Sequence, residues 1–393
     1  MKDTSDRRME GMKLSLFHGI RFDRNELSGA FGDIGTDFPL IVGIILASGI
    51  DPVGALVMFG ALQIMTGLIY GIPMPVQPLK AMAVIVITQK LSGNILCGAG
   101  LAIGILMLIL SLSGLINVIA KVVPLCVVRG IQFGLGMQLA ILALKDYVPA
   151  DGLMGYGIAL LCFVFVILFL GNRKYPAALF VIGMGVIYAV FFKLHLAHLA
   201  QGIGFQLPKL HVPAMQDVIT GFLLLSLPQI PLSIGNSILA TQQTAKDLFP
   251  ERPPLMIRKI SFTYSIMNLI APFFGGIPVC HGAGGMAGHY TFGARTGGAP
   301  IIYGAMYLIL GLFFGGVFGD VVHIFPKPML GVLLFFEGMA LMKLMFGTAL
   351  SKKQIMIVLM VGLMAVGLPY GYLIGLIVGT ILAHIFEKRE GIS

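Results

Sequence analysis

Residues 73–80 read Pro-Met-Pro-Val-Gln-Pro-Leu-Lys and place three prolines close together in an otherwise apolar chain. Proline has no amide donor and disrupts a helix interior, so this stretch cannot continue a regular helix. It can form an extended crossing segment, followed by a helix whose first turn contains Pro78. The segment therefore predicts a half-helix that begins next to extended backbone.

The rest of the chain is strongly apolar. Its 393 residues are 57% hydrophobic and only 11% charged, with a mean hydropathy of +0.95. Soluble proteins average about 25% charged residues, so this composition excludes a soluble enzyme and a nucleic-acid-binding protein. At membrane depth, non-helical backbone is tolerated only inside protein or beside a cavity, so residues 73–80 should border one. We expect no cofactor, no bound metal and no nucleic acid.

Apolar stretches that suit membrane-spanning helices fill nearly the whole chain. We predict an all-α polytopic membrane protein with about 14 spans, of which the third and the tenth are too short for a full crossing. Reading the last two as one broken hairpin would give about 12 spans instead. The predicted spans are 29–49, 53–71, 77–90, 97–119, 124–144, 152–170, 175–193, 216–240, 258–276, 281–291, 300–319, 326–346, 353–368 and 369–386.

Basic residues are distributed unequally between the two sides of this topology. With the N-terminus inside, 20 of the 26 Lys and Arg residues lie inside, and Lys80 falls within span 3. This bias agrees with the positive-inside rule, so we predict a multi-pass protein of the cell (inner) membrane with both termini cytoplasmic. The outside segments carry Lys90, Lys145, Lys193, Lys209 and Lys327.

Two halves of the chain share short motifs in the same order and at nearly the same offset. Gly-Ile-Pro at 71–73 returns at 276–278, and Pro124 returns as Pro326. The offset is seven spans, an odd number, so the second copy is inverted in the bilayer. We therefore predict a 7+7 inverted repeat in which the half-helices of spans 3 and 10 meet at the midplane. Paired interrupted helices of this kind are typical of secondary transporters.

Both half-helix starts carry groups that suit an anion. A helix that begins near Gln77 directs free N–H groups and a positive dipole end at the cavity, where Lys80 adds a full charge. The second motif, Pro-Val-Cys-His-Gly-Ala-Gly-Gly at 278–285, has small residues that let backbone approach a ligand closely. The predicted substrate-binding residues are Gln77, Pro78, Leu79, Lys80, Cys280, His281, Gly282, Ala283, Gly284 and Gly285, with Gln229, Asn236 and Ser237 from span 8.

Simpler roles remain open for several of these residues. Lys80 could snorkel to a lipid headgroup, with the prolines forming a loop. His281 could be a hydrogen-bonded core histidine that never meets a ligand. The polar residues of span 8, Gln229, Asn236 and Ser237, could hold helices together rather than bind substrate.

Acidic residues within spans are candidates for a functional role because they are costly to bury in a bilayer. Asp33 and Asp37 lie early in span 1 and could carry a coupling proton, although Asp33 could instead pair with Lys80. Glu337 occupies the repeat position of Leu135, so the symmetry does not single it out.

The motifs resemble those of the MOT-type molybdate transporters of the sulfate-permease superfamily, and the resemblance runs from about residue 25 to residue 385. It rests on the proline motif at 73–80 and the Cys-His-Gly-Ala-Gly-Gly motif at 280–285, which together are specific. Further matches are Phe-Gly-Asp-Ile-Gly-Thr at 31–36, Gly-Asn-Ser at 235–237, Asp-Leu-Phe-Pro at 247–250 and Phe-Gly-Ala-Arg-Thr-Gly at 292–297.

The resemblance implies two domains, with substrate between half-helices 3 and 10 and a core that moves against a gate. Many members of this superfamily carry a soluble C-terminal regulatory domain, but this sequence ends soon after the last predicted span, so we expect no such domain here. The expected divisions are a cytoplasmic N-terminal segment at 1–28, a core domain at 29–120 and 216–322, a gate domain at 121–215 and 323–386, and a cytoplasmic tail at 387–393.

The implied function is secondary active uptake of an oxyanion, molybdate, with the bilayer as the other partner. Tungstate and sulfate share its charge and shape, so a sulfate transporter of the same fold is the nearest alternative. A nucleobase transporter would more often carry acids in span 8, where this chain has Gln229 and Asn236. A membrane-embedded enzyme would depend on Cys280 and His281 alone, so we expect no enzyme. The coupling ion, and whether the chain forms a homodimer, stay open.

Overall fold

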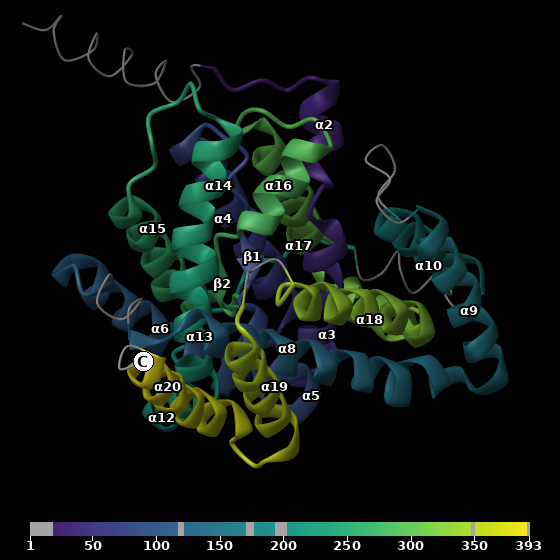
Figure 1. Cartoon of the computed structure of the whole chain (residues 1–393). Helices are drawn as coiled ribbons and strands as arrows, with labels where there is room; N and C mark the ends of the chain where they lie inside the picture. Colours follow the sequence, from purple (N-terminus) through teal and green to yellow (C-terminus); the bar gives the residue numbers. More distant parts are fainter. Residues whose placement is uncertain (1–18, 117–121, 170–176, 193–202, 347–349, 391–393) are drawn as a thin grey trace, which may run out of the picture.

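The protein is described by a computed structural model that covers residues 19–116, 122–169, 177–192, 203–346 and 350–390. Residues 1–18 of the predicted N-terminal segment, residues 391–393 of the tail and parts of spans 4, 6 and 7 lie outside these ranges. The described chain is almost entirely helical (Figure 1). In the first half the elements are α2 (Arg24–Ala30), α3 (Ile34–Ser48), α4 (Pro52–Tyr70), β1 (Gln77–Pro78), α5 (Lys80–Gln89), α6 (Gly93–Ser113), α8 (Leu125–Leu142), η1 (Ala143–Tyr147), η2 (Val148–Asp151), α9 (Gly152–Phe169) and α10 (Ala177–Phe192).

The second half has the same order of elements, a series of helices interrupted by one short strand. Its elements are α12 (Met215–Gly221), η3 (Phe222–Ser226), α13 (Leu227–Leu232), η4 (Ser233–Ala240), α14 (Thr241–Leu248), α15 (Ile257–Ile270), η5 (Ala271–Phe274), β2 (Val279–Cys280), α16 (Ala283–Thr291), α17 (Gly298–Ile324), α18 (Lys327–Lys343), α19 (Lys352–Gly367) and α20 (Gly371–Glu390).

Several helices have the length and composition of membrane spans. Among the described residues, five helical runs are long and apolar enough to cross a bilayer, and six if α2 and α3 count as one span bent by 42°. The prediction of an all-helical membrane protein is therefore confirmed. The two predicted half-helices are short, with ten residues in α5 and nine in α16.

The boundary between predicted spans 5 and 6 differs from the expectation. The sequence predicts a loop after residue 144, but η1 and η2 continue the helical path from α8 to α9, and the whole run covers Leu125–Phe169. Pro149 lies in the first turn of η2, where the path changes from a π-helix to a 3₁₀-helix. The path changes direction between α8 and α9 (Figure 1).

The strands β1 and β2 form an antiparallel pair, with Gln77 opposite Cys280 and Pro78 opposite Val279. Each is anchored by an amide side chain from the helix before it. Gln63 of α4 donates to the Val76 carbonyl at 2.9 Å and accepts from the Val76 amide at 3.1 Å. In the other half, Asn268 of α15 bonds both backbone groups of Val279 in the same way, at 2.6 and 2.9 Å. The two halves therefore hold their strands by equivalent contacts, which supports the repeat.

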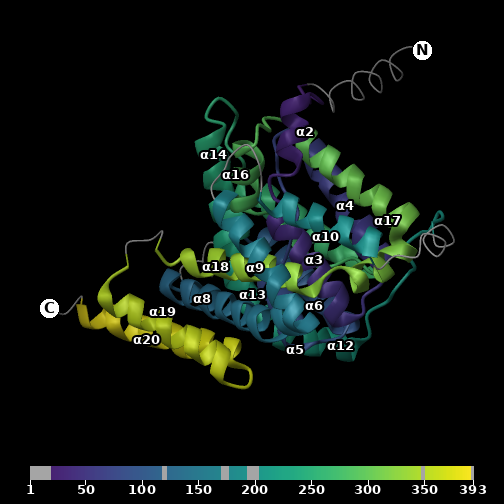
Figure 2. The same ribbon diagram turned by 90° about the vertical axis from the view of Figure 1, so that its right-hand side faces the viewer.

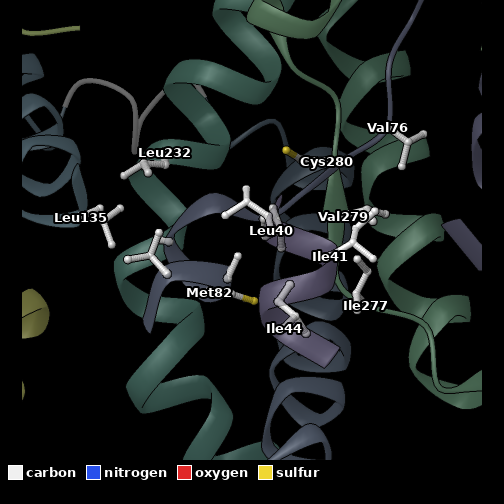
Figure 3. Packing of buried hydrophobic residues seen from close by; sticks show 14 of the residues in the cluster. Leu40, Ile41, Ile44, Val76, Met82, Leu135, Leu232, Ile277, Val279 and Cys280 are labelled. Carbon is white, nitrogen blue, oxygen red and sulfur yellow. The ribbon is translucent and has the colours of Figure 1, made fainter. Parts of the chain in front are cut away.

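Apolar side chains surround this crossing. Leu40, Ile41 and Ile44 of α3 belong to the same buried cluster as Met82 of α5 and Val279 of β2 (Figure 3). Lipid tails are as apolar as these side chains, so close packing rather than the hydrophobic effect drives helix association in a bilayer. The cluster fixes α3 and α5 beside the strand pair.

Small residues bring two other helices into close contact. A Cβ atom at Gly60 of α4 would meet the Gly304 carbonyl of α17 at 2.5 Å, and a Cβ at Gly304 would meet the Gly60 carbonyl at the same distance. This reciprocal contact is the small-residue packing typical of membrane helices. Figure 2 shows α4 and α17 side by side, with α19 and α20 forming a separate pair on the far side of α8.

Candidate functional site

A cavity of about 240 Å³ lies beside the crossing of β1 and β2. It is bordered by the starts of both half-helices and by α13 and η4. Three predicted residues, Pro78, Leu79 and Gly285, do not line it. The ten predicted residues that do are Gln77, Lys80, Gln229, Asn236, Ser237, Cys280, His281, Gly282, Ala283 and Gly284. The sequence did not point to the others, which are Arg129, Leu232, Ala240 and Leu344.

The first turn of α16 offers free backbone donors to this cavity. Gly282 is the N-cap, and its carbonyl accepts the first helical bond from Met286 at 3.1 Å. Within the described residues, the amides of Ala283, Gly284 and Gly285 donate to no protein acceptor. A Cβ atom at Gly284 would have no protein atom within 4 Å, so this residue faces open space. Free amides and a positive helix end are favourable surroundings for an anion.

The start of α5 differs from that of α16, although the sequence predicts the same role for both. The Leu79 amide donates to the Pro278 carbonyl at 3.0 Å, next to the strand pair. The amides of Ala81 and Met82 donate to Oε1 of Gln229 at 2.9 and 3.4 Å. The expectation of free amides at this end needs correction, because a buried side chain satisfies the helix start. Gln229 thus acts on the cavity by capping α5.

The ring of His281 is held entirely by the protein. It is fully buried, with Nε2 2.8 Å from Oγ1 of Thr263 and Nδ1 3.2 Å from the Pro75 carbonyl oxygen. Its edge also contacts the Tyr70 ring. The ring therefore has the role of a hydrogen-bonded core histidine, which ties the Pro75 segment to α15.

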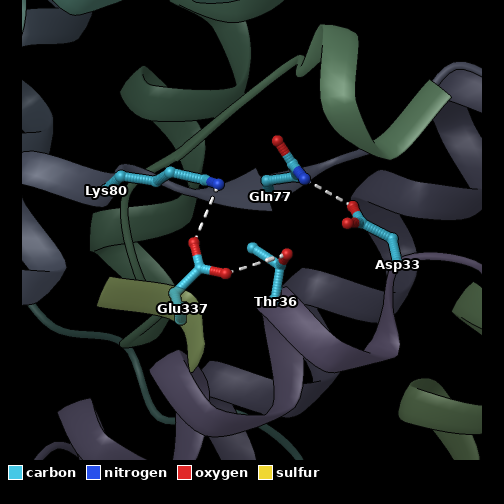
Figure 4. Close-up of polar contacts among 5 residues, drawn as sticks. All are labelled: Asp33, Thr36, Gln77, Lys80 and Glu337. Carbon is cyan, nitrogen blue, oxygen red and sulfur yellow. Dashed lines mark hydrogen bonds and ion pairs between the residues drawn. The ribbon is translucent and has the colours of Figure 1, made fainter. Parts of the chain in front are cut away.

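Lys80 is the cationic side chain at the α5 end of the cavity, and it is already paired. Its Nζ lies 2.9 Å from Oε1 of Glu337 in α18, and Oγ1 of Thr36 donates to Oε2 of the same carboxylate at 3.2 Å (Figure 4). Beside this pair, Nε2 of Gln77 donates to Oδ2 of Asp33 at 2.6 Å. The salt-bridge partner of Lys80 is thus Glu337. Asp33, which the sequence offered as a partner for Lys80, instead accepts a hydrogen bond from Gln77.

Glu337 is the residue that the sequence argument passed over. The equivalent position in the first half of the repeat is Leu135, so the repeat symmetry gave no reason to place an acid at the site. The structure places its carboxylate against the predicted anion-binding lysine, with the side chain only 4% exposed. Its position as an acid within the apolar helix α18 was the signal that could have identified it.

The two remaining acids lie behind the cavity lining. A Cβ atom at Gly285 would collide with the Asp33 carboxylate, so Asp33 sits against the first turn of α16. Asp37 is completely buried, and neither carboxylate oxygen has a hydrogen-bond partner among the described residues. An unpaired ionised carboxylate is costly in such surroundings.

A second cavity, of about 570 Å³, lies at the other end of the same helices. The site cavity touches Lys80 at the start of α5 and Arg129 near the start of α8. The second cavity touches Lys90 after the end of α5 and Lys145 after the end of α8. The two spaces share no lining residue, so protein separates them along α5 and α8.

Comparison with known sequences gives a consistent assignment. The family model described as "Molybdate transporter of MFS superfamily" matches residues 25–139 and 221–341. Molybdate transporters 1 and 2 of Arabidopsis thaliana are 33% and 34% identical over alignments of 362 and 365 residues, gaps included. These alignments cover 80% and 81% of this chain and 78% of each relative. Molybdate transporter 1 of Chlamydomonas reinhardtii is 27% identical over an alignment of 430 residues, gaps included, which covers 81% of this chain and 83% of its own.

Solved structures identify the fold. The transmembrane domain of the cyanobacterium bicarbonate transporter BicA matches 93% of this chain and 98% of its own, with a TM-score of 0.63 and 18% identity. The murine anion transporter Slc26a9 in the inward-facing state matches 96% of this chain and 70% of its own, with a TM-score of 0.71 and 13% identity. The fold is therefore SLC26-like, a fold that contains a 7+7 inverted repeat. The chain belongs to the molybdate transporter family that the matching family model describes, a family of transporters and not of enzymes.

Proposed function

We propose that the chain is a secondary active transporter that takes up molybdate across the cytoplasmic membrane. The observation that carries this proposal is the cavity between the free amides of α16 and the ammonium group of Lys80. These groups suit a small oxyanion, because the amides are fixed donors and the lysine adds a full positive charge. The Arabidopsis and Chlamydomonas relatives, named as molybdate transporters, support molybdate as that anion.

Sulfate transport by the same fold is the second candidate. Amide dipoles and an ammonium group respond to the charge and size of an anion and not to its central atom. These groups therefore do not by themselves select molybdate over sulfate. A nucleobase is a poorer fit, because Gln229, Asn236 and Ser237 supply the lining from α13 and η4 without an acid.

The two cavities support transport by alternating access. We propose a core domain at 29–120 and 216–322 that moves against a gate domain at 121–215 and 323–386, within a topology of about 14 spans. The site cavity and the second cavity lie toward opposite ends of α5 and α8 and share no lining residue.

We propose that both termini are cytoplasmic, from the excess of basic residues on that side. Glu251 and Lys209 are exposed and lie on opposite sides of this topology. In intact cells, an impermeant thiol reagent should label Lys209→Cys but not Glu251→Cys, and membrane disruption should expose both. The native cysteines are all buried, which keeps background labelling low. Labelling of Glu251→Cys in intact cells would contradict the proposed orientation and indicate the opposite one.

We propose Asp33 and Asp37 as the groups that couple transport to protons. Asp37 has no hydrogen-bond partner among the described residues, so it is most stable there as the neutral acid. Asp33 lies between Gln77 and the first turn of α16, where its charge bears directly on an anion in the cavity. Gain and loss of a proton at these acids would change the electrostatic cost of placing a dianion beside Lys80.

Uptake of labelled molybdate into proteoliposomes tests the function. We expect saturable uptake that an inward proton gradient accelerates, with tungstate competing nearly as well as unlabelled molybdate. Sulfate should compete measurably but less strongly than tungstate. Its bonds are shorter, so its oxygens reach the same hydrogen-bond donors less well. Uptake no greater than in protein-free liposomes would refute molybdate transport, and stronger competition by sulfate than by tungstate would favour the sulfate alternative.

A further inference from the structure

We propose that Glu337 is the resident counter-ion of Lys80, a carboxylate that neutralises the lysine in the empty transporter and that the substrate oxyanion displaces. The inference rests on the proposed function and deepens it, because it names the internal group with which substrate must compete. Glu337 would then be a specificity-determining residue that sets anion affinity without contacting the anion.

The arrangement of the three side chains carries the proposal. Lys80 lines the cavity and is 26% exposed, whereas Glu337 does not line it and is 4% exposed. The ammonium group thus lies between a buried carboxylate 2.9 Å away and the open space where an anion would sit. Thr36 donates to the second oxygen of Glu337 at 3.2 Å, so the carboxylate has a fixed place behind the lysine.

Competition follows from charge. An ammonium group has three donors, so its geometry allows both a carboxylate and an oxyanion to bind at once. Two negative ligands on one cation, however, repel each other strongly where the surroundings are apolar. Asp33, which Gln77 holds beside this pair, makes another negative charge still less acceptable whenever it is ionised. The Lys80–Glu337 contact must therefore loosen when a dianion occupies the cavity.

The Lys80–Glu337 pair also connects the two proposed domains, which are expected to move relative to each other during transport. Thr36 belongs to α3 and Lys80 to α5, both in the proposed core, whereas Glu337 belongs to α18 in the proposed gate. In this state the empty site is therefore tied across the two domains. Displacement of Glu337 by the anion would release that tie, so occupancy of the site and freedom of the core to move would change together.

The test is equilibrium binding of molybdate to the purified full-length chain carrying Glu337→Gln. Glutamine keeps the shape of the side chain and an acceptor for Thr36 but removes the charge that competes for Lys80. We expect Kd to fall by about tenfold, the low end of the value for a charge-assisted hydrogen bond. Glu251→Gln, the same change at an exposed site, should leave Kd unchanged.

A double-mutant cycle separates this role from a general effect on structure. In a Lys80→Gln background the same Glu337→Gln change should tighten binding much less, because the cation for which Glu337 competes is gone and only its direct repulsion of the anion remains. A Kd equal to or weaker than that of the wild type in a folded Glu337→Gln protein would overturn the proposal. If that variant does not fold, Glu337→Asp provides the test. The shorter side chain of aspartate weakens the pair with Lys80, so the proposal requires that molybdate binds more tightly to this variant as well. Absence of molybdate binding by the wild type would instead refute the proposed function.

Discussion

Lys80→Gln is expected to weaken molybdate binding by about 10- to 150-fold, which corresponds to the 1.5–3 kcal/mol of a hydrogen bond to a charged group. The lysine is the cation at the α5 end of the cavity, where the helix amides are already taken by Gln229 and Pro278. Its loss removes one of the two cationic side chains that line the cavity and leaves Arg129, near the start of α8, as the other. Equilibrium binding of labelled molybdate to the purified protein measures the effect.

Two controls make this result specific. Lys90→Gln removes the same charge at the far end of α5, where the side chain is exposed and borders the second cavity, and should change Kd by less than about twofold. Lys80→Gln also leaves the Glu337 carboxylate without its cation, a change that costs about 3–5 kcal/mol of stability in a buried pair. The double variant Lys80→Gln, Glu337→Gln avoids that cost and should bind equally poorly. Wild-type affinity in either variant would rule out Lys80 as a substrate ligand.

Gly284→Val should produce the second large effect, a loss of about 1–3 kcal/mol in binding free energy, or roughly 5- to 150-fold in Kd. A Cβ at this position meets no protein atom within 4 Å, so the new side chain fills the cavity rather than straining the fold. It would stand where an anion must approach the amides of the α16 first turn. Binding and thermal unfolding, measured on the same preparation, should show lost affinity with little loss of stability.

Other glycines show why this position is the informative one. A Cβ atom at Gly157 of α9 would also have no protein atom within 4 Å, and this residue lies away from the site, so Gly157→Val should bind molybdate normally. Gly282 is a poorer probe, because a Cβ there would collide with the Gln77 side chain and disturb the protein itself. Normal binding by Gly284→Val would show that the anion does not use the α16 amides.

The central feature of the fold could be predicted because its signals are local. Prolines at 73–80 and small residues at 278–285 interrupt long apolar stretches, and the repeat relates the two interruptions. Extended backbone cannot face lipid, so these segments had to meet inside the protein, and they do so as β1 and β2. The continuous helical path through η1 and η2 was missed, because polar residues at 145–151 resemble a loop when only local sequence is considered.

The contacts that complete the site depend on residues far apart in the chain. Gln229 caps α5 and Glu337 pairs with Lys80 across sequence separations of 148 and 257 residues. No local pattern predicts which helix start a distant side chain will reach. The repeat also misled, because it relates positions in the two halves, whereas Lys80 and Glu337 lie in non-equivalent spans and meet only through the fold.

Anomalous scattering from molybdenum tests the placement of the anion most directly. Crystals of the purified protein grown with molybdate and measured on both sides of the molybdenum absorption edge would locate the metal without any assumption about the site. We expect a single strong peak in the cavity between Lys80 and the amides of Ala283 and Gly284, and a clearly weaker one in crystals of Lys80→Gln grown at the same molybdate concentration. A peak elsewhere, or one in this cavity that survives the loss of Lys80 undiminished, would contradict the proposed site.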